Sequence, residues 1–371
     1  MKMKVKTLLN TFLILSFALM STHSYSLEKL KFLSSQQFPT GFRFKDSEVG
    51  GLSSLYFRES DQSYFAISDD RGQNGLPRVY QLKIAVQNSQ LKVDFIDVIH
   101  LKNLSSQAFE TDHIDPEGIV LLKDNMWISS EGDTRKKSDI KGPELLQFNL
   151  GGQLLRSINL PEHYQFNILQ KMGPRNNMSI ESLSLTPDLS QLVIGFENAL
   201  FQDGDLNNAL KSSLVRFLKV SMSSELNQIT QNQITEYFYR LPPIPAPNFD
   251  PKKYHDYAIS DMLMIDSNSA YMIERGFIGS EMRYKIKIVT ASGFDQIKPK
   301  SNENNLLSRE EILNLEDIIS TLPAELNRLE NYEGIAFGPK LENGHQTLIL
   351  CSDNNFHPLQ RTSFLFFEII P

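Results

Sequence analysis

Residues 331–356 read NYEGIAFGPKLENGHQTLILCSDNNF, and this stretch sets the pattern for the whole chain. It contains two apolar runs, residues 335–337 and 347–351, each short enough to be a buried strand. The Gly-Pro and Asn-Gly pairs between them predict a hairpin connection. One acid, Glu333, stands before the first run, and another, Asp353, follows the second. An antiparallel pair of strands would therefore bring these two acids together.

Four upstream segments carry the same unit, in which polar residues flank two apolar runs. The unit recurs roughly every 70 residues, and its opening positions are Gly50, Glu117, Glu181, Asp261 and Glu333. Its closing positions carry acids, amides and arginines: Asp69, Asp70, Arg71, Glu131, Glu197, Glu274, Arg275, Asp353 and Asn354. The first copy is the weakest, because glycine stands where the others open with a carboxylate. Self-similarity at a long period predicts a repeat architecture.

Each unit also supplies the strands of a propeller blade. Two further alternating runs follow the first three units, and four strands per repeat are typical of a β-propeller. The sequence thus predicts an all-β fold with five blades, whereas six blades would require one unrecognised copy. The last unit has only three strands, and the segment LKFLSSQQF at residues 30–38 could supply the fourth. Pairing the two chain ends in this way would close the ring and remove its open edges.

One segment departs from the strand pattern. Residues 308–329 show Ile312, Leu315 and Ile319 at helical spacing, and Ser308 with Glu311 resembles a capping box. We therefore expect a short helical insertion there, before the last blade.

The N-terminus has the three parts of a secretory signal peptide. Three lysines precede an apolar stretch at residues 8–20, and small polar residues follow. We expect residues 1–26 to be removed and residues 27–371 to form one propeller domain. An uncleaved membrane anchor is the alternative, although the apolar stretch is short for a bilayer span. The single cysteine, Cys351, excludes an intrachain disulfide and lies far from any lipid-bearing position.

The charge of the mature chain limits its partners. Removing residues 1–26 takes away three lysines and no acid, so the formal net charge moves from -7 to -10. An acidic protein is a poor partner for nucleic acid, whose phosphates require a basic surface. We expect a periplasmic or secreted monomer without stable membrane insertion. The acidic charge is compatible with a small anionic substrate held by a few arginines or by a bound cation.

The repeats resemble the phytase-like family, described as having an esterase-like activity of phytase, from about Gly50 to the C-terminus. The resemblance rests on DPEG at residues 115–118, IES at 180–182, ISD at 259–261, and NYEG at 331–334 with SDNNF at 352–356. The third copy departs from the pattern, with Ser182 where glycine is usual. The resemblance implies a β-propeller, a secreted location and hydrolysis of a phosphate ester.

The repeated acids predict a site at one mouth of the propeller channel, because the first strand of each blade lines that channel. So many carboxylates cannot converge without compensation, since like charges raise each other's pKa. A hard cation such as Ca²⁺ would accept their oxygens. We predict these metal ligands: Glu131, Glu181, Glu197, Asp261, Glu274, Asp353 and Asn354. We predict catalytic roles for Glu117, Glu333, Arg71 and Arg275, the arginines neutralising phosphate charge.

Two alternatives remain open from the sequence. The carboxylates could accept hydrogen bonds from loop amides and lock one blade to the next, with no catalytic role. The protein would then be a non-catalytic periplasmic propeller that binds a small ligand, a metal or a protein partner. The chain contains no G-x-S-x-G elbow, H-E-x-x-H motif or P-loop, so the enzyme hypothesis depends on carboxylates and a cation.

Overall fold

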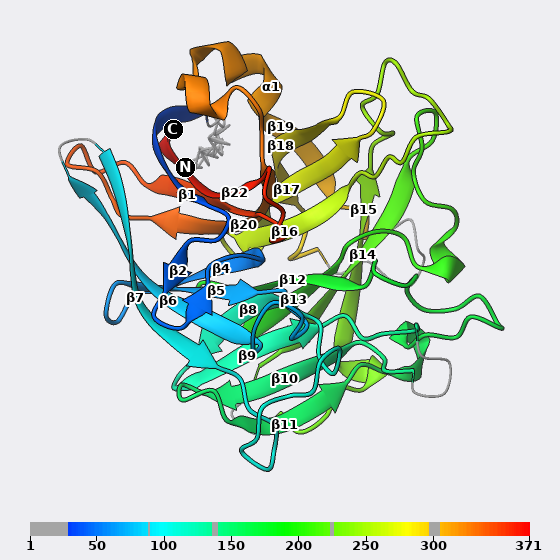
Figure 1. Ribbon diagram of the computed structural model, residues 1–371. Helices are drawn as coiled ribbons and strands as arrows, with labels where there is room; N and C mark the ends of the chain where they lie inside the picture. Colours follow the sequence, from blue (N-terminus) through cyan, green and yellow to red (C-terminus); the bar gives the residue numbers. More distant parts are fainter. Residues whose placement is uncertain (1–28, 88–89, 136–139, 223–225, 297–304) are drawn as a thin grey trace, which may run out of the picture.

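The computed structural model describes residues 29–371, apart from residues 88–89, 136–139, 223–225 and 297–304 (Figure 1). Five four-stranded antiparallel sheets are arranged around a central axis. The predicted signal peptide, residues 1–26, lies outside the described residues. None of the helices in the part of the chain that is described has the length and apolar character needed to span a bilayer.

Each blade is built from strands in sequence order from the centre outward, except the last. Blade 1 comprises β4 (Leu52–Arg58), β5 (Ser63–Ser68), β6 (Arg78–Gln87) and β7 (Gln90–His100). Blade 2 comprises β8 (Pro116–Leu122), β9 (Asn125–Ser130), β10 (Glu144–Asn149) and β11 (Leu154–Asn159). Blade 3 comprises β12 (Ile180–Leu185), β13 (Gln191–Phe196), β14 (Ser213–Ser221) and β15 (Ile234–Leu241). Blade 4 comprises β16 (Ala258–Met264), β17 (Ser269–Ile278), β18 (Arg283–Ser292) and β19 (Ser308–Asn314).

Blade 5 joins the two ends of the chain. It comprises β20 (Asn331–Gly338), β21 (Thr347–Asp353), β22 (Arg361–Ile370) and the N-terminal β1 (Lys29–Pro39). Strand β1 pairs antiparallel with β22, from Lys29 opposite Ile370 to Pro39 opposite Arg361. The five blades and the closing strand are both confirmed, and a six-bladed ring is excluded. Closure by the N-terminal strand covers the edge that β22 would otherwise expose.

The predicted helical insertion is much shorter than expected. Residues Ser308–Asn314 form β19, which pairs with β18, so Ser308 and Glu311 are not a helix cap. Only α1 (Leu315–Ile318) is α-helical, followed by the 3-10 turns η4 (Ile319–Thr321) and η5 (Ala324–Leu326). Helical spacing misled us here because blade 4 needs a fourth strand, and tertiary pairing overrides local propensity.

Small elements complete the fold. They are the hairpin β2 (Arg43–Phe44) and β3 (Ser47–Glu48), and the 3-10 turns η1 (Glu162–Tyr164), η2 (Phe201–Asp203) and η3 (Gln231–Gln233). Apolar side chains between adjacent blades form the core, as alternation along half-buried strands requires.

Every innermost strand contains an irregularity near its start. The pairing register shifts between Leu52 and Ser54 in β4, and at the matching position in β8, β12, β16 and β20. A β-bulge adds an extra residue and re-aims its side chain. The bulges contain Ser53, Glu117, Glu181, Ser260 and Glu333. The fold thus presents one extra residue per blade at the same level of the ring.

Candidate functional site

A cavity of about 930 Å³ lies at one end of the ring, where the innermost strands begin and the second strands end. Residues from all five blades line it, and acids dominate its deep wall. The carboxylates that line it from the repeated positions are Asp69, Glu117, Glu131, Glu181, Glu197, Glu333 and Asp353. The two predicted arginines, Arg71 and Arg275, line the same cavity. The expected convergence of strand-start and strand-end residues at one mouth therefore occurs.

The first set of carboxylates comes from the β-bulges. Glu117, Glu181 and Glu333 occupy the bulges of blades 2, 3 and 5. Serines replace them in the other two blades, and both serines hold a neighbouring blade instead. Ser53 Oγ donates to the Glu117 carbonyl at 2.7 Å, and Ser260 Oγ donates to the Tyr332 carbonyl at 3.2 Å.

The second set comes from the ends of the second strands. Asp69 N donates to Gly51 O at 2.8 Å, Glu131 N to Asp115 O at 2.9 Å, and Glu197 N to Ser179 O at 2.8 Å. Asp353 pairs with Asn331 at the same point of blade 5. In blade 4 this position pairs with Ala258 and is occupied by Arg275. The guanidinium of Arg275 thus stands where the other four blades have a carboxylate.

Two predicted metal ligands, Asp261 and Glu274, lie away from the cavity wall. The bulge of blade 4 holds Ser260, so Asp261 is one residue further on. Its Oδ2 accepts from Ile335 N at 3.0 Å and from Ser54 Oγ at 3.2 Å, in the buried interior. Asp261 and Gly50 are therefore not equivalent to the glutamates in the bulges of the other three blades. A shift along the strand turns a side chain to another face.

Glu274 is fully occupied elsewhere. Arg309 donates to both of its carboxylate oxygens, at 2.8 and 2.7 Å, and two tyrosines, Tyr239 and Tyr257, donate to the same group. Glu274 is thus part of a buried network joining blades 3 and 4 and is not available to a cation in the cavity.

Asn354, the third predicted ligand outside the cavity wall, hydrogen-bonds to the N-terminal segment and to its own loop. Its Oδ1 accepts from Phe356 N at 3.1 Å and Gly51 N at 3.3 Å, and its Nδ2 donates to Thr40 Oγ1 at 3.1 Å. These bonds tie the β21–β22 connection, where Asn354 lies, to the segment between β1 and β4.

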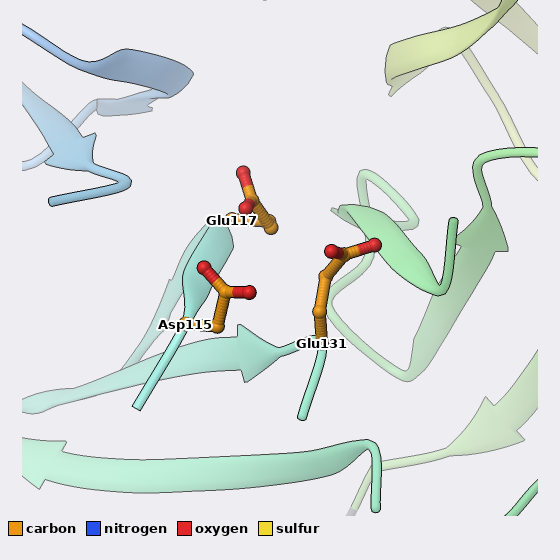
Figure 2. Close-up of side chains that lie close together, drawn as sticks. All are labelled: Asp115, Glu117 and Glu131. Carbon is orange, nitrogen blue, oxygen red and sulfur yellow. The ribbon is translucent and has the colours of Figure 1, made fainter. Parts of the chain in front are cut away.

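Two groups of three carboxylates have the spacing of a metal site. Asp115, Glu117 and Glu131 each offer an oxygen, and these oxygens lie within 4.8 Å of one another. Glu131, Glu181 and Glu197 form a second group with the same spacing. Figure 2 shows the first group, in which the side chains of Asp115 and Glu117, around the start of β8, and of Glu131, just after β9, lie close together. Glu131 belongs to both groups and is therefore the centre of the acidic site.

Burial and mutual repulsion shift these acids strongly. Burial raises the pKa of Glu333 to about 8, that of Glu197 to about 7, and that of Asp353 to about 6. The pKa values of Glu117 and Glu131 also lie well above the ordinary value, because of burial and the neighbouring carboxylates. A cation bound among them would lower the pKa values of the carboxylates that it contacts.

Arg275 is the only arginine deep in the cavity among the described residues that line it. Its Nη2 lies 2.9 Å from Glu333 Oε1 and 3.4 Å from Glu197 Oε1, and its Nη1 lies 3.1 Å from Asp256 Oδ2. Its Nε is buried without a hydrogen-bond partner. Asp256 was not identified from the sequence, since it lies in the proline-rich loop outside the repeated unit.

Arg71 lies at the rim and joins blades 1, 2 and 3. Its Nε donates to Asp115 Oδ1 and its Nη2 to Asn177 Oδ1, each at 2.5 Å. The turn that carries Arg71 is held by Asp70, whose Oδ2 pairs with the buried Arg78 at 2.8 Å. Sequence analysis did not identify Asn177 or Arg78, because neither belongs to the repeated motif.

The donor set suits a hard cation. Both groups of three offer only carboxylate oxygens, which Ca²⁺ prefers, whereas zinc sites usually contain histidine or cysteine. Asn331 adds an amide oxygen, since its Oδ1 is buried without a partner while its Nδ2 donates to Glu333 Oε1 at 2.9 Å. The residues present therefore fit a calcium ion.

Comparisons with solved structures return other proteins at low identity. An endo-arabinase from Bacteroides thetaiotaomicron is 10% identical, with a TM-score of 0.40, covering 92% of this chain and 98% of that chain. A periplasmic gluconolactonase from Pseudomonas aeruginosa is 11% identical, with a TM-score of 0.37 and coverage of 88% and 90%. A mannose phosphorylase from Leishmania mexicana, in complex with a phosphate ion, is 10% identical, with a TM-score of 0.40 and coverage of 87% of each chain. Resemblance at this level says nothing of activity.

No curated protein matches the sequence. The family model "Phytase-like: Esterase-like activity of phytase" matches residues 47–356, which is more than half of the chain and includes all five bulges. The protein therefore belongs to the phytase-like family.

Proposed function

We propose that this protein is a periplasmic or secreted hydrolase that cleaves phosphate esters with the help of a bound calcium ion. The observation that carries the proposal is the convergence of carboxylates from four blades on one cavity that holds a single deep arginine. Six of them, Glu117, Glu131, Glu181, Glu197, Glu333 and Asp353, are buried, and so is the neighbouring Asp115. An uncompensated excess of buried acids is unfavourable, and a divalent cation relieves it.

Glu131 would be a ligand of the ion in either position, because it belongs to both groups of three carboxylates. Asp115 with Glu117 on one side and Glu181 with Glu197 on the other would complete the oxygen shell. When bound, calcium would supply positive charge to the phosphate and make a nearby water more acidic.

The remaining polar residues have consistent roles. Oε1 of Glu333 already accepts from Arg275 and Asn331, so Oε2 is the oxygen that carries the proton at neutral pH. Glu333 is therefore suited to protonate the departing alcohol, and Glu117 to accept a proton from the attacking water. Arg71, at the rim, is placed to attract the phosphate.

A specific observation favours a second candidate function. Arg71 and Arg275 are both already paired with carboxylates, which reduces the positive charge they can offer to a phosphate. A non-catalytic propeller would use the same cavity to bind a small ligand, a metal or a protein partner.

A hydrolysis assay distinguishes the hydrolase from the non-catalytic binding propeller. The mature protein is stripped with a chelator and assayed with p-nitrophenyl phosphate and phytate, with and without calcium. We expect calcium-dependent hydrolysis that falls at least about a hundredfold in Glu131→Gln, since single catalytic electrostatic groups contribute on this scale. Glu342→Gln, an exposed residue on the β20–β21 hairpin, is the matched control. Calcium binding without hydrolysis of either substrate would favour the binding propeller.

A further inference from the structure

The wall of the cavity changes character from one side to the other. On the side of blades 1 and 2 it is polar and charged, with these lining residues: Asp69, Arg71, Gln73, Asn74 and Arg135. The side of blades 4 and 5 also carries polar residues, among them Arg328 and His357, but it adds a group of apolar and aromatic side chains. We call Tyr254, Phe277, Met282, Tyr284 and Leu359 the apolar wall.

The residues of the apolar wall come from three segments that lie against one another: the loop before β16, the β17–β18 hairpin and the β21–β22 connection. Gly279 N, in the β17–β18 hairpin, donates to Tyr254 O at 3.0 Å, which places the loop before β16 against this hairpin. The rings of Phe277 and Tyr284 meet edge to face with centroids 5.3 Å apart. The Tyr284 hydroxyl accepts from the side chain of Gln360, the residue after Leu359, at 2.9 Å.

Three members of the apolar wall are largely unburied. Tyr254 and Met282 are each 65% exposed, and Leu359 is 70% exposed. They border a cavity whose deep part is polar. Apolar surface that rims a concave polar site is typical of a binding site for a ligand that has both characters.

Met282 adopts a left-handed backbone conformation, as ten other non-glycine residues of the described chain do. Met282 has φ of 54° at the last position of the turn between Ile278 and Arg283. Glycine or asparagine normally occupies such a left-handed position, and a bulky residue is unfavourable there. Packing does not explain the methionine, because the side chain is mostly exposed.

We propose that the apolar wall binds the alcohol part of the substrate, so the natural substrate is a phosphate ester of an aromatic or long-chain alcohol. This inference rests on the proposed function, since it takes the phosphate to lie at the acidic end of the cavity. A phosphorylated polyol would leave the apolar wall exposed to water and gain nothing from it.

Binding of phosphonates tests the inference without turnover. The mature, calcium-loaded protein is titrated by calorimetry with (2-naphthyl)methylphosphonate and with methylphosphonate, which carry the same charged group. We expect the naphthyl compound to bind at least about tenfold more tightly, because it buries apolar area on both partners. In the double variant Met282→Gly with Leu359→Ser, the ratio of the two affinities should fall, because two of the five residues of the apolar wall lose their apolar side chains.

The variants separate binding from folding. Met282→Gly removes backbone strain, so its melting temperature should be equal to or above that of the wild type. Leu169→Ser changes a leucine that is 98% exposed and does not line the cavity, and it should leave the affinity ratio unchanged. A fall of the ratio in the double variant with an unchanged melting temperature supports the inference.

Hydrolysis distinguishes failure of this inference from failure of the proposed function. 2-Phenylethyl phosphate and ethyl phosphate release alcohols of similar acidity, so their kcat/KM values compare binding of the alcohol part. Equal values, together with equal phosphonate affinities, would overturn the inference and leave the proposed function standing. No hydrolysis and no phosphonate binding would overturn both.

Discussion

At the scale of single residues, Glu274 and Arg275 show how strand alternation separates structure from function. They are neighbours in β17, so their side chains lie on opposite faces. Glu274 is closed off by Arg309 and two tyrosines, whereas Arg275 enters the cavity between Glu197 and Glu333. Adjacent charges of one motif therefore serve different purposes.

Arg275 should contribute strongly to stability. We predict that Arg275→Gln lowers the free energy of unfolding by about 3–5 kcal/mol, because it leaves buried carboxylates without their cationic partner. Arg283→Gln removes an arginine whose side chain is 53% exposed, and it should change stability by about 1 kcal/mol or less. Urea unfolding of the calcium-free proteins measures both. Equal effects of the two variants would contradict the description of Arg275.

The shifted acids predict how the stability of the calcium-free protein depends on pH. The pKa of Glu333 is about 8 in the folded chain, above its ordinary value of 4.5, so the folded state binds more protons between these pH values. Stability should therefore be greatest below about pH 4.5 as far as this group is concerned, and fall as the pH rises to about 8. Thermal melts from pH 5 to pH 8 measure this slope, which Glu333→Gln should reduce. A melting temperature that rises over this range would contradict the burial of ionisable acids.

At the scale of the elements, the β-bulges decide which residues reach the cavity. The sequence predicts the paired strands and their polar ends, and it places Glu117, Glu181 and Glu333 correctly at the cavity. It does not reveal where each bulge falls, because a bulge depends on pairing with the neighbouring strand. In blade 4 the bulge holds Ser260, whereas the sequence pointed to Asp261. At the end of the second strand Arg275 reaches the cavity as predicted, whereas the predicted ligand Glu274 does not.

Gly118 permits the close approach of two blades at the acidic site. A Cβ at this position would lie 2.7 Å from Leu183 N and 3.0 Å from Leu183 Cγ. We predict that Gly118→Ala lowers stability by about 1–3 kcal/mol through overpacking. Its displacement of the neighbouring Glu117 should also weaken calcium binding. Gly151→Ala, whose Cβ would meet only Asn149 Oδ1 at 3.3 Å, is the control for calorimetry and urea unfolding. If Gly118→Ala bound calcium as tightly as the wild type, Gly118 would have no role in positioning the calcium ligands.

At the scale of the whole molecule, the repeat pattern predicts the ring and its closure. Five copies of one unit give five blades, and the segment near Leu30 supplies the missing strand, as the pairing of β1 with β22 confirms. The helical spacing around Ile312 was misleading, because local periodicity cannot show that an edge strand is needed. A search for repeats also could not identify Asp256, because this residue lies in the proline-rich loop outside the repeated unit.

Ring closure by β1 predicts a sharp limit for truncation at the N-terminus. Removing residues 1–26 should leave the melting temperature and the oligomeric state unchanged. Removing residues 1–39 deletes β1 and exposes the edge of β22, which invites pairing with other chains. Size-exclusion chromatography and thermal melting compare the two truncated proteins. A longer truncation that remains a stable monomer would contradict closure of the ring by this strand.

The central claim is that the acidic cavity holds a calcium ion, and calorimetric titration of the chelator-stripped protein tests it most directly. We predict calcium binding that is lost or weakened at least about a hundredfold in Glu131→Gln, since Glu131 belongs to both groups of three carboxylates. The exposed control Glu342→Gln should bind calcium as the wild type does. Absence of calcium binding by the wild-type protein, or equal binding by Glu131→Gln, would contradict the claim.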